Sequence, residues 1–389
     1  MHICLLYDRL YPSTIGGAER WYRGVAEALS ARGHEVTYLT LRHWERGAEP
    51  EIPGVRVLAG GPRLEPYTPH RRALLPPLLF GATTLWHLLR HGRDYDVVHT
   101  ASFPYFSVLA ALCTRPLGRY RLCVDWHEVW TQEGWRSYAG RAAGAVGRLV
   151  QRICVRSRHS AFTFSRLHAE RLRSQGHGGE VTVLTGEYAG PRVPPSRERP
   201  EPLVVFAGRH VPEKRVPALI HAFARVHAVE PGLRCEVYGD GPQRDEVDEL
   251  VQRLGLRGCV SLPGLVETEV LEAALGRACC LVLPSSREGY GLVLVEAAAR
   301  GTPSVVVAGP DNAAVELVED GVNGVVAPSA GPEDLAAAIL RIVREADGFR
   351  ASTADWYERN ERGLSLEGSL ERVLESYGAG TKVPTRNAP

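Results

Sequence analysis

The sequence lacks a C-x-x-C pair, although it has eight cysteines, and most of them lie within apolar runs. Zinc ribbons and thioredoxin-like redox sites depend on such pairs, so buried free thiols are expected instead of metal ligands or disulfides. The longest apolar stretch, residues 73–86, contains Pro76 and Pro77 and is too short to span a bilayer. Strand-like residues begin at Ile3, which leaves no room for a signal peptide. These absences favour a cytoplasmic protein without a bound metal.

Neither sign of charge dominates: the 389 residues have a net charge of +1, and 23% of them are charged. Nothing in this balance points to nucleic acid or to a disordered chain. The length suits two domains or a few, each with its own core. Two similar halves of alternating strands and helices are present, but no shorter repeat of about 20–50 residues.

The G-x-G-x-x-G dinucleotide fingerprint is also missing. A predicted buried strand at residues 2–7 leads through a loop to Gly16 and Gly17, and a helix then runs to about Ala31. The loop is too long for the tight turn of that fingerprint, which argues against a nicotinamide enzyme. The two glycines are either a plain loop before a helix or a place where a substrate approaches the backbone.

The D-x-D motif of Asp94 and Asp96 resembles the cation-binding motif of some sugar transferases. It comes immediately before a predicted strand at residues 97–100, at the amino edge of the sheet. Ligands of parallel sheets bind at the carboxyl edge, so we interpret this motif as a solvated turn. By contrast, His127 and Glu128 follow the predicted strand 122–126 at its carboxyl edge. His127 is either a satisfied histidine or a ligand-facing one whose ring the following acid orients.

Nine arginines and one acid, Glu170, lie between Arg136 and Arg173. Arg148, Arg152 and Arg156 recur every fourth residue and therefore share one face of a predicted helix. Such a face is either solvated or in contact with anionic lipid or a phosphorylated substrate.

The second half begins after a proline-rich linker at residues 190–202. A strand at 203–207 is followed by Gly208 and Arg209, then by Lys214 and a helix at 216–229. A second strand ends near Pro284, and its glycine turn (Gly289, Gly291) precedes a helix at about 292–300. Helix N-termini and cations at the carboxyl edge of a sheet are suited to a diphosphate. The acids beside them, Glu288 and Glu296, are better suited to sugar hydroxyls.

The remaining pattern predicts an acidic helix at 311–319, strands at 304–308 and 321–328, a last helix at 353–377 and a disordered tail at 379–389. The predicted domains are accordingly 1–189 and 203–352, with the linker 190–202 between them and a terminal helix at 353–378.

Four segments together resemble a known family: GGAER at 16–20, DWHE at 125–128, FAGRHVPEKR at 206–215 and EGYGLVLVEA at 288–297. Over nearly the whole chain, the sequence is similar to the retaining, nucleotide-sugar-dependent glycosyltransferases of family four. This resemblance implies an α/β chain of the GT-B fold: two Rossmann-like domains facing a central cleft, with a C-terminal helix that crosses back to the first domain.

The resemblance also implies roles for individual residues. Arg209 and Lys214 would bind the donor diphosphate, Glu288 the donor sugar, Glu296 the ribose, and His127 the transferring sugar. The backbone around Gly16, Gly17 and Gly208 would lie near the substrates, and the backbone from Gly289 through Tyr290 and Gly291 to Leu292 near the distal phosphate. The donor would be a UDP- or GDP-sugar, and no cofactor is expected.

Two segments depart from the family pattern: TGEY at 185–188 replaces an asparagine-glycine turn, and GPDNA at 309–313 replaces a glycine-rich one. Both are expected to affect specificity. No carboxylate pair is evident for a double displacement, so a front-face substitution without metal is predicted. The predicted acceptor is a hydroxyl; alternatively, the protein couples a sugar or a cyclitol to nitrogen or sulfur. A non-catalytic nucleotide-sugar sensor is the other alternative.

Overall fold

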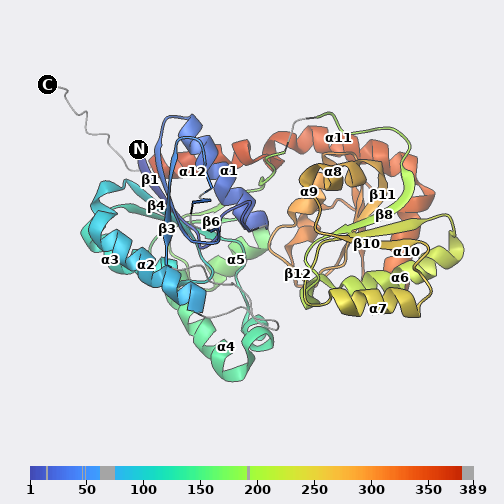
Figure 1. The fold of residues 1–389 in the computed structure, drawn as a ribbon, viewed down its shortest axis with the longest axis horizontal. Helices are drawn as coiled ribbons and strands as arrows, with labels where there is room; N and C mark the ends of the chain where they lie inside the picture. The colour runs from blue at the N-terminus through green and yellow to red at the C-terminus, as the bar shows by residue number, and fades with distance from the viewer. Residues whose placement is uncertain (15, 46, 49, 62–74, 191–192, 379–389) are drawn as a thin grey trace. The chain divides into compact units, whose positions relative to one another are not determined.

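The computed structural model of the chain describes every residue except 15, 46, 49, 62–74, 191–192 and 379–389. The predicted disordered tail lies outside the described residues. Two compact units are formed: unit 1 is Met1–Ala189 with the described part of Ser365–Pro389, and unit 2 is Gly190–Leu364. Each unit is a parallel sheet with helices packed on it (Figure 1).

Unit 1 contains a seven-stranded sheet in the order β3-β2-β1-β4-β5-β6-β7, and every neighbouring pair is parallel. Its strands are β1 (His2–Leu6), β2 (Glu35–Leu41), β3 (Val55–Gly60), β4 (Val97–Ala101), β5 (Arg121–Trp126), β6 (Ser160–Thr163) and β7 (Val181–Val183). Its helices are α1 (Gly17–Ala31), α2 (Leu75–His91), η1 (Gly92–Asp94), α3 (Phe106–Gly118), α4 (Gln132–Arg156), α5 (Arg166–Ser174) and α12 (Leu366–Gly378). The central strands are almost entirely buried, as expected of a sheet covered on both faces, and they are mainly apolar apart from buried polar residues such as His99, Thr100 and Asp125.

Unit 2 repeats this arrangement with a six-stranded parallel sheet in the order β10-β9-β8-β11-β13-β15. These strands are β8 (Glu201–Ala207), β9 (Arg234–Tyr238), β10 (Val260–Gly264), β11 (Ala278–Leu283), β13 (Ser304–Val307) and β15 (Gly324–Ala327). A small separate ladder pairs β12 (Arg287–Glu288) with β14 (Asp311–Asn312). The helices are η2 (Pro212–Lys214), α6 (Val216–Val229), α7 (Arg244–Arg253), α8 (Thr268–Arg277), α9 (Leu292–Ala298), η3 (Ala313–Leu317), α10 (Pro332–Arg344) and α11 (Ala346–Leu364).

Two sequence-based element predictions were wrong. The acidic helix predicted at 311–319 is instead β14 followed by the short 3₁₀ helix η3. There the Asn312 side chain accepts from the Ala314 N–H and donates to the carbonyls of Ser285 and Val307, so it holds a turn that a longer helix would break. The helix predicted at 353–377 begins earlier, at Ala346, and is interrupted at Ser365.

The interruption at Ser365 divides the C-terminal segment between the two units. In unit 2, the buried guanidinium of Arg350 on α11 donates to the carbonyls of Gly276 and Ala278 at 2.9 and 2.6 Å. In unit 1, the Leu366 N–H of α12 donates to the Tyr188 carbonyl at 2.9 Å. The chain therefore returns to unit 1, which confirms the predicted crossing of the C-terminal helix.

Every cysteine is free, and all but Cys113 and Cys259 are buried, as the sequence predicted. Within the described residues, no helix is long and apolar enough to cross a membrane.

Candidate functional site

In unit 1, polar side chains gather where β5 ends. His127 follows Trp126, the last residue of that strand, and its ring stacks on Phe164 with centroids 4.6 Å apart and planes within 3°. The Nδ1 atom of His127 lies 3.8 Å from Oε1 of Glu187, and its Nε2 atom is buried without a hydrogen-bond partner among the described residues. The ring is therefore held in position, and one of its nitrogens has unused hydrogen-bonding capacity within the described part of the chain.

Glu128 does not orient this ring, contrary to the sequence-based interpretation. Its carboxylate instead accepts from the Trp130 indole N–H. Glu187 is the acid beside His127, and it comes from the TGEY segment after β7. Sequence reasoning attached that segment to specificity but did not single out Glu187, because the contact depends on how β5 and β7 are placed in the sheet.

Burial governs the protonation of this pair. Burial, with a smaller contribution from the nearby Asp125 charge, raises the pKa of Glu187 to about 8. Burial also lowers the pKa of His127, against the opposing effect of Asp125 and Glu19. Near neutral pH both groups are therefore predominantly uncharged, and Glu187 can donate a hydrogen bond. This neutral acid and neutral imidazole are the features of unit 1 best suited to general acid–base chemistry.

Asp125 is an ionised carboxylate close to Glu187 and His127. It accepts from His99 Nε2 at 2.7 Å and from the Trp21 indole N–H at 2.8 Å, and it is fully buried. Burial alone would raise the pKa of Asp125, but the His99 and Trp21 contacts lower it below its ordinary value. On the far side of the His99 ring, Nδ1 lies 2.6 Å from the Tyr377 hydroxyl of α12. The C-terminal helix thus supports the acid at the end of β5.

Gly16 and Gly17 begin α1 close to these acids. A Cβ atom at Gly16 would lie 2.3 Å from the carboxylate of Glu19, which is buried and pairs with Arg9 at 3.3 Å. A Cβ atom at Gly17 would lie 3.7 Å from Oε2 of Glu187. At Gly16 the neighbouring group is thus an acid of the protein, and the approach of a substrate to these two glycines stays a prediction. The structure also brings Gly17 to the His127 neighbourhood.

In unit 2, the predicted donor residues lie at the carboxyl ends of two neighbouring strands. Lys214 ends η2, which follows β8, and Glu288 ends β12, which follows β11. The Lys214 ammonium donates to Glu288 Oε1, and the Ser285 hydroxyl donates to the same oxygen at 2.7 Å. Lys214 and Glu288 are thus held together at the carboxyl edge of the sheet, the edge at which the sequence placed both residues.

Backbone contacts join the loops of unit 2. Ser286 donates its N–H to the Glu213 carbonyl at 2.8 Å, which ties the β11 loop to the β8 loop. At Gly239, φ is +110°, and a Cβ atom would lie 2.0 Å from the carbonyl oxygen of Gly208. Only glycine allows this approach of the β9 loop to the β8 loop. The β9 loop consequently packs against the β8 loop, which carries the exposed side chain of Arg209.

The rest of the predicted donor stretch surrounds α9. Gly291 caps this helix in the left-handed conformation (φ +102°), which a residue with a Cβ atom adopts rarely. Gly289 and Leu292 are half-buried and Tyr290 is buried, while Glu296 is half-buried on the helix itself. The predicted strand, glycine turn and helix are therefore confirmed as local structure.

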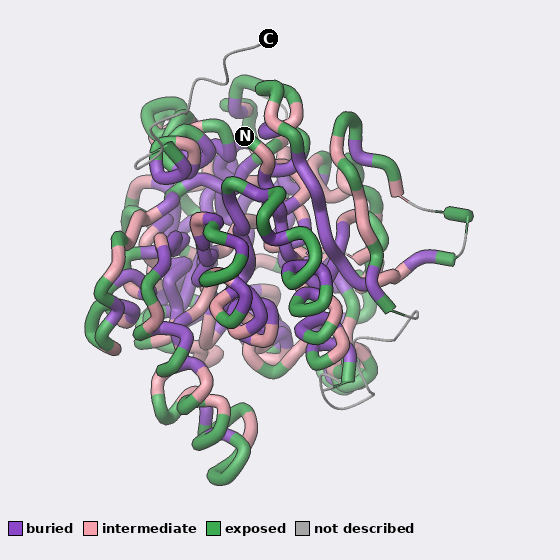
Figure 2. Tube along the Cα trace, turned by 90° about the vertical axis from the view of Figure 1, so that its left-hand side faces the viewer, coloured by how far each residue is buried: buried purple, intermediate pink, exposed green. Residues whose placement is uncertain are grey.

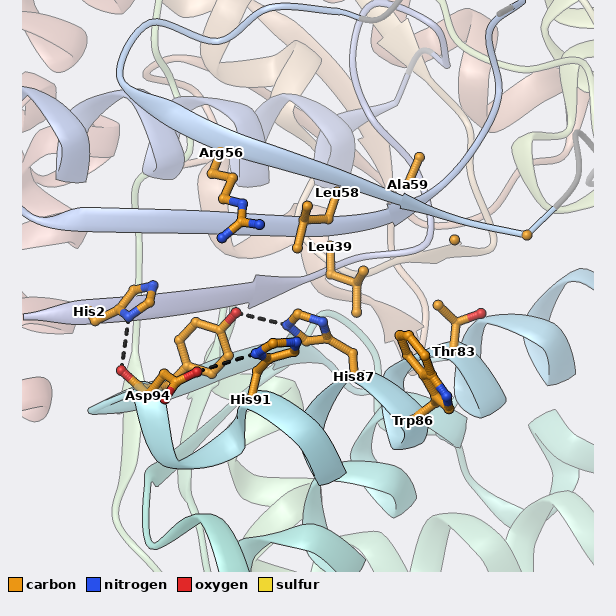
Figure 3. Close-up of a pocket in the computed structure, with 13 residues that line it drawn as sticks. His2, Leu39, Arg56, Leu58, Ala59, Thr83, Trp86, His87, His91 and Asp94 are labelled. Carbon is orange, nitrogen blue, oxygen red and sulfur yellow. Dashed lines mark hydrogen bonds and ion pairs between the residues drawn. The ribbon is translucent and has the colours of Figure 1, made fainter.

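The D-x-D motif lies elsewhere. Asp96 precedes β4 and accepts from the His2 N–H at 2.8 Å, so it helps to hold the amino edge of the sheet. Asp94 borders a cavity of about 470 Å³ beneath α2 (Figure 3), where it pairs with His91 at 3.3 Å. His87 in the same cavity bonds the Tyr95 hydroxyl at 2.8 Å, and burial lowers its pKa to about 4. None of the predicted site residues lines this cavity, and its polar groups are largely satisfied internally.

Comparisons with known proteins agree with this arrangement. The family described as "Glycosyl transferases group 1" matches residues 192–361, and "Glycosyltransferase Family 4" matches residues 15–185. A glycogen synthase of Mycobacterium tuberculosis is 30% identical over 371 residues, covering 88% of this chain and 86% of the relative. An exopolysaccharide phosphotransferase of Streptomyces coelicolor is 39% identical over 163 residues, but this chain spans only 17% of its length.

Solved structures show the same fold. Sucrose-phosphate synthase from Thermosynechococcus elongatus superimposes with a TM-score of 0.81 at 21% identity, covering 97% of this chain and 98% of that one. HepE from Anabaena, solved with UDP and glucose, has a TM-score of 0.70 at 19% identity, covering 97% and 100%. With two family matches that together extend over most of the chain and a relative of similar length, this protein belongs to the group 1 glycosyltransferases and has the GT-B fold.

Proposed function

We propose that this glycosyltransferase transfers a hexose from a nucleoside diphosphate donor to an acceptor hydroxyl with retention of configuration and without a metal ion. The observation that carries the proposal is the convergence of Lys214 and Glu288 at the ends of neighbouring strands, with Arg209 in the same loop as Lys214. The donor diphosphate would replace Glu288 as the partner of Lys214. Glu288 would then turn to the sugar hydroxyls. A UDP-sugar is the donor we favour, because HepE was solved with UDP and glucose.

Charge dictates the mechanism. Breaking the bond between sugar and diphosphate leaves positive charge on the anomeric carbon and negative charge on the departing phosphate. Arg209 and Lys214 would stabilise the phosphate, so the protein supplies the cations that a metal would otherwise provide. His127 would contact the transferred sugar. The departing phosphate would take the proton of the acceptor hydroxyl, so that attack and departure occur on the same face of the sugar.

One experiment tests these points together. UDP-glucose, UDP-galactose, UDP-N-acetylglucosamine and GDP-mannose are incubated with the protein and a panel of sugar, cyclitol and thiol acceptors, with and without EDTA. Mass spectrometry identifies products, and NMR coupling of the anomeric proton gives their configuration. We expect an α-linked oxygen glycoside from an α-linked donor, at a rate that EDTA leaves nearly unchanged. An inverted product would exclude the front-face mechanism, and a rate restored only by Mg²⁺ or Mn²⁺ would exclude metal independence. Donor binding with neither transfer nor slow hydrolysis would favour the sensor.

The membrane contact predicted from Arg148, Arg152 and Arg156 is a separate proposal and does not bear on this chemistry.

A further inference from the structure

Helix α4 of unit 1 is built from two pieces. Gly140 has φ +78° and ψ −176°, which interrupts the helix, and the second piece runs from Arg141 to Arg156. In Figure 1, α4 extends away from the sheet of unit 1 at the bottom of the view. Its inner side is firmly held: the buried Gln151 amide oxygen accepts from the Tyr105 hydroxyl at 2.9 Å and the Trp135 indole at 3.0 Å.

The outer side of this second piece is apolar. Val146, Leu149 and Ile153 are 63%, 59% and 51% exposed, and their spacing of three and four residues places them along one stripe. Figure 2 shows exposed residues along this helix, the lowest in that view. A soluble helix normally turns such a stripe toward the core, whereas here the core-facing side is occupied by Gly144, Gln151, Cys154 and Val155. The three exposed side chains of this stripe therefore do not contribute to the hydrophobic core of unit 1.

Arginines flank the stripe on one side. Because an α-helix turns by about 100° per residue, one strip of the helix surface, between the apolar stripe and the buried face, carries Arg141, Arg148, Arg152 and Arg156. All four side chains are exposed, and no Asp or Glu occurs from 141 to 156. Within the described part of the chain, none of them forms an ion pair, and Arg148 donates only to Gln132 Oε1 at 2.6 Å. Four uncompensated positive charges thus border an exposed apolar surface.

We propose that the outward face of residues 141–156 binds the surface of an anionic lipid bilayer. Val146, Leu149 and Ile153 would lie among the headgroups and upper acyl chains, with the arginines at the lipid phosphates. An apolar stripe beside basic residues is the arrangement of helices that lie in the plane of the membrane interface. A soluble polyanion would need the arginines but not the stripe. A second copy of the chain would bring the same positive charges together, which is unfavourable.

Vesicle co-sedimentation tests the proposal. The full chain is mixed with vesicles of phosphatidylcholine alone or with 30% phosphatidylglycerol. We expect binding to the anionic vesicles that weakens as salt rises, and little binding to the neutral ones. Arg152→Glu/Arg156→Glu should bind at least about 25-fold more weakly, since each arginine near the surface contributes about a fivefold gain. A matched control is Arg344→Glu/Arg359→Glu, which makes the same charge change at exposed positions of unit 2 and should bind like the parent protein.

The apolar stripe has its own variant, Leu149→Ser/Ile153→Ser, which keeps every arginine. Lipid insertion predicts that this variant also loses most vesicle binding, while its unfolding temperature stays unchanged because both side chains are exposed. Binding that survives this variant but not the arginine variant would overturn insertion in favour of a general polyanion site. The absence of vesicle binding by the parent protein would overturn the proposal outright. So would a parent dimer in sedimentation analysis that this variant converts to a monomer without any effect on lipid.

Discussion

The polar groups of unit 1 and those of unit 2 differ in charge. In unit 1, the buried Asp125 carboxylate accepts hydrogen bonds from His99 and Trp21. The raised pKa of Glu187 and the lowered pKa of His127 leave that pair uncharged near neutral pH. In unit 2 the groups form an ion pair, Lys214 with Glu288, and the Arg209 side chain is exposed. A diphosphate needs fixed positive charge, whereas a reacting sugar needs hydrogen-bonding groups that do not attract water or ions. This contrast is the reason why we propose donor anchoring in unit 2 and contacts with the sugar in unit 1.

The largest effect is expected from removing the cation of unit 2. Lys214→Ala should reduce both donor affinity and turnover, by about 10²–10³-fold in kcat, because the departing phosphate loses a stabilising charge. It should also lower the thermal stability of the protein, since Glu288 is left buried without its cation.

A double variant separates these two effects. Lys214→Ala/Glu288→Gln removes the stranded charge, so the unfolding temperature should recover in part while turnover stays low. Calorimetry of UDP binding and steady-state kinetics give the readouts. If the double variant recovered activity together with stability, Lys214 would serve the fold of unit 2 and not the donor.

A smaller and more selective effect is expected in unit 1. His127→Ala removes a group assigned to the sugar and not to the nucleotide, so the affinity for free UDP should be unchanged. Turnover should fall by about 10²-fold, the range of a single transition-state contact. Equal losses of UDP affinity in His127→Ala and Lys214→Ala would remove the distinction between the two halves.

The smallest effect concerns the neutral acid of unit 1 and is measured on stability. Glu187 has a folded pKa of about 8, above its ordinary value of 4.5. Below about pH 4.5 the carboxyl is protonated in both states, and as pH rises toward 8 the unfolded chain loses the proton first, so stability declines. Glu187→Gln abolishes this decline. We expect it to raise the unfolding temperature by a few degrees at pH 8.5 and by little at pH 4.5. A gain of the same size at both pH values would show that Glu187 is not held protonated.

The sequence predicted those parts of the site that depend on local order along the chain. Lys214, Gly291 and the start of α9 follow from a strand, a turn and a helix in succession, and each was confirmed in place. The partners of His127 did not follow, because Asp125, Glu187 and Tyr377 meet only through strand order and the return of α12. Glu128 was favoured only because it is adjacent in sequence, although successive residues point in different directions.

The fold shows the same limit. Periodicity predicted α1 and α6 closely, yet it extended one helix through Ser365, because charge pairs and apolar spacing continue across that residue. The break is tertiary in origin: Tyr188 pairs with Ser365 as an isolated bridge, and the Leu366 N–H bonds the Tyr188 carbonyl. Such a contact between residues far apart in the chain leaves no local pattern to detect.

The return of α12 also sets an order of events during synthesis. Unit 1 is interrupted by residues 190–364, so a ribosome making about 5–20 residues per second spends roughly ten to thirty-five seconds between β7 and α12. Throughout that interval the nascent first unit lacks the Tyr377 hydroxyl that contacts His99. The surface of unit 1 on which Leu370 and Val373 of α12 become buried also remains exposed. Unit 2 has all of its own strands before that covering arrives. The unit that is made first is therefore the last to be completed, and chaperones have their longest opportunity to act on the unit that holds His127.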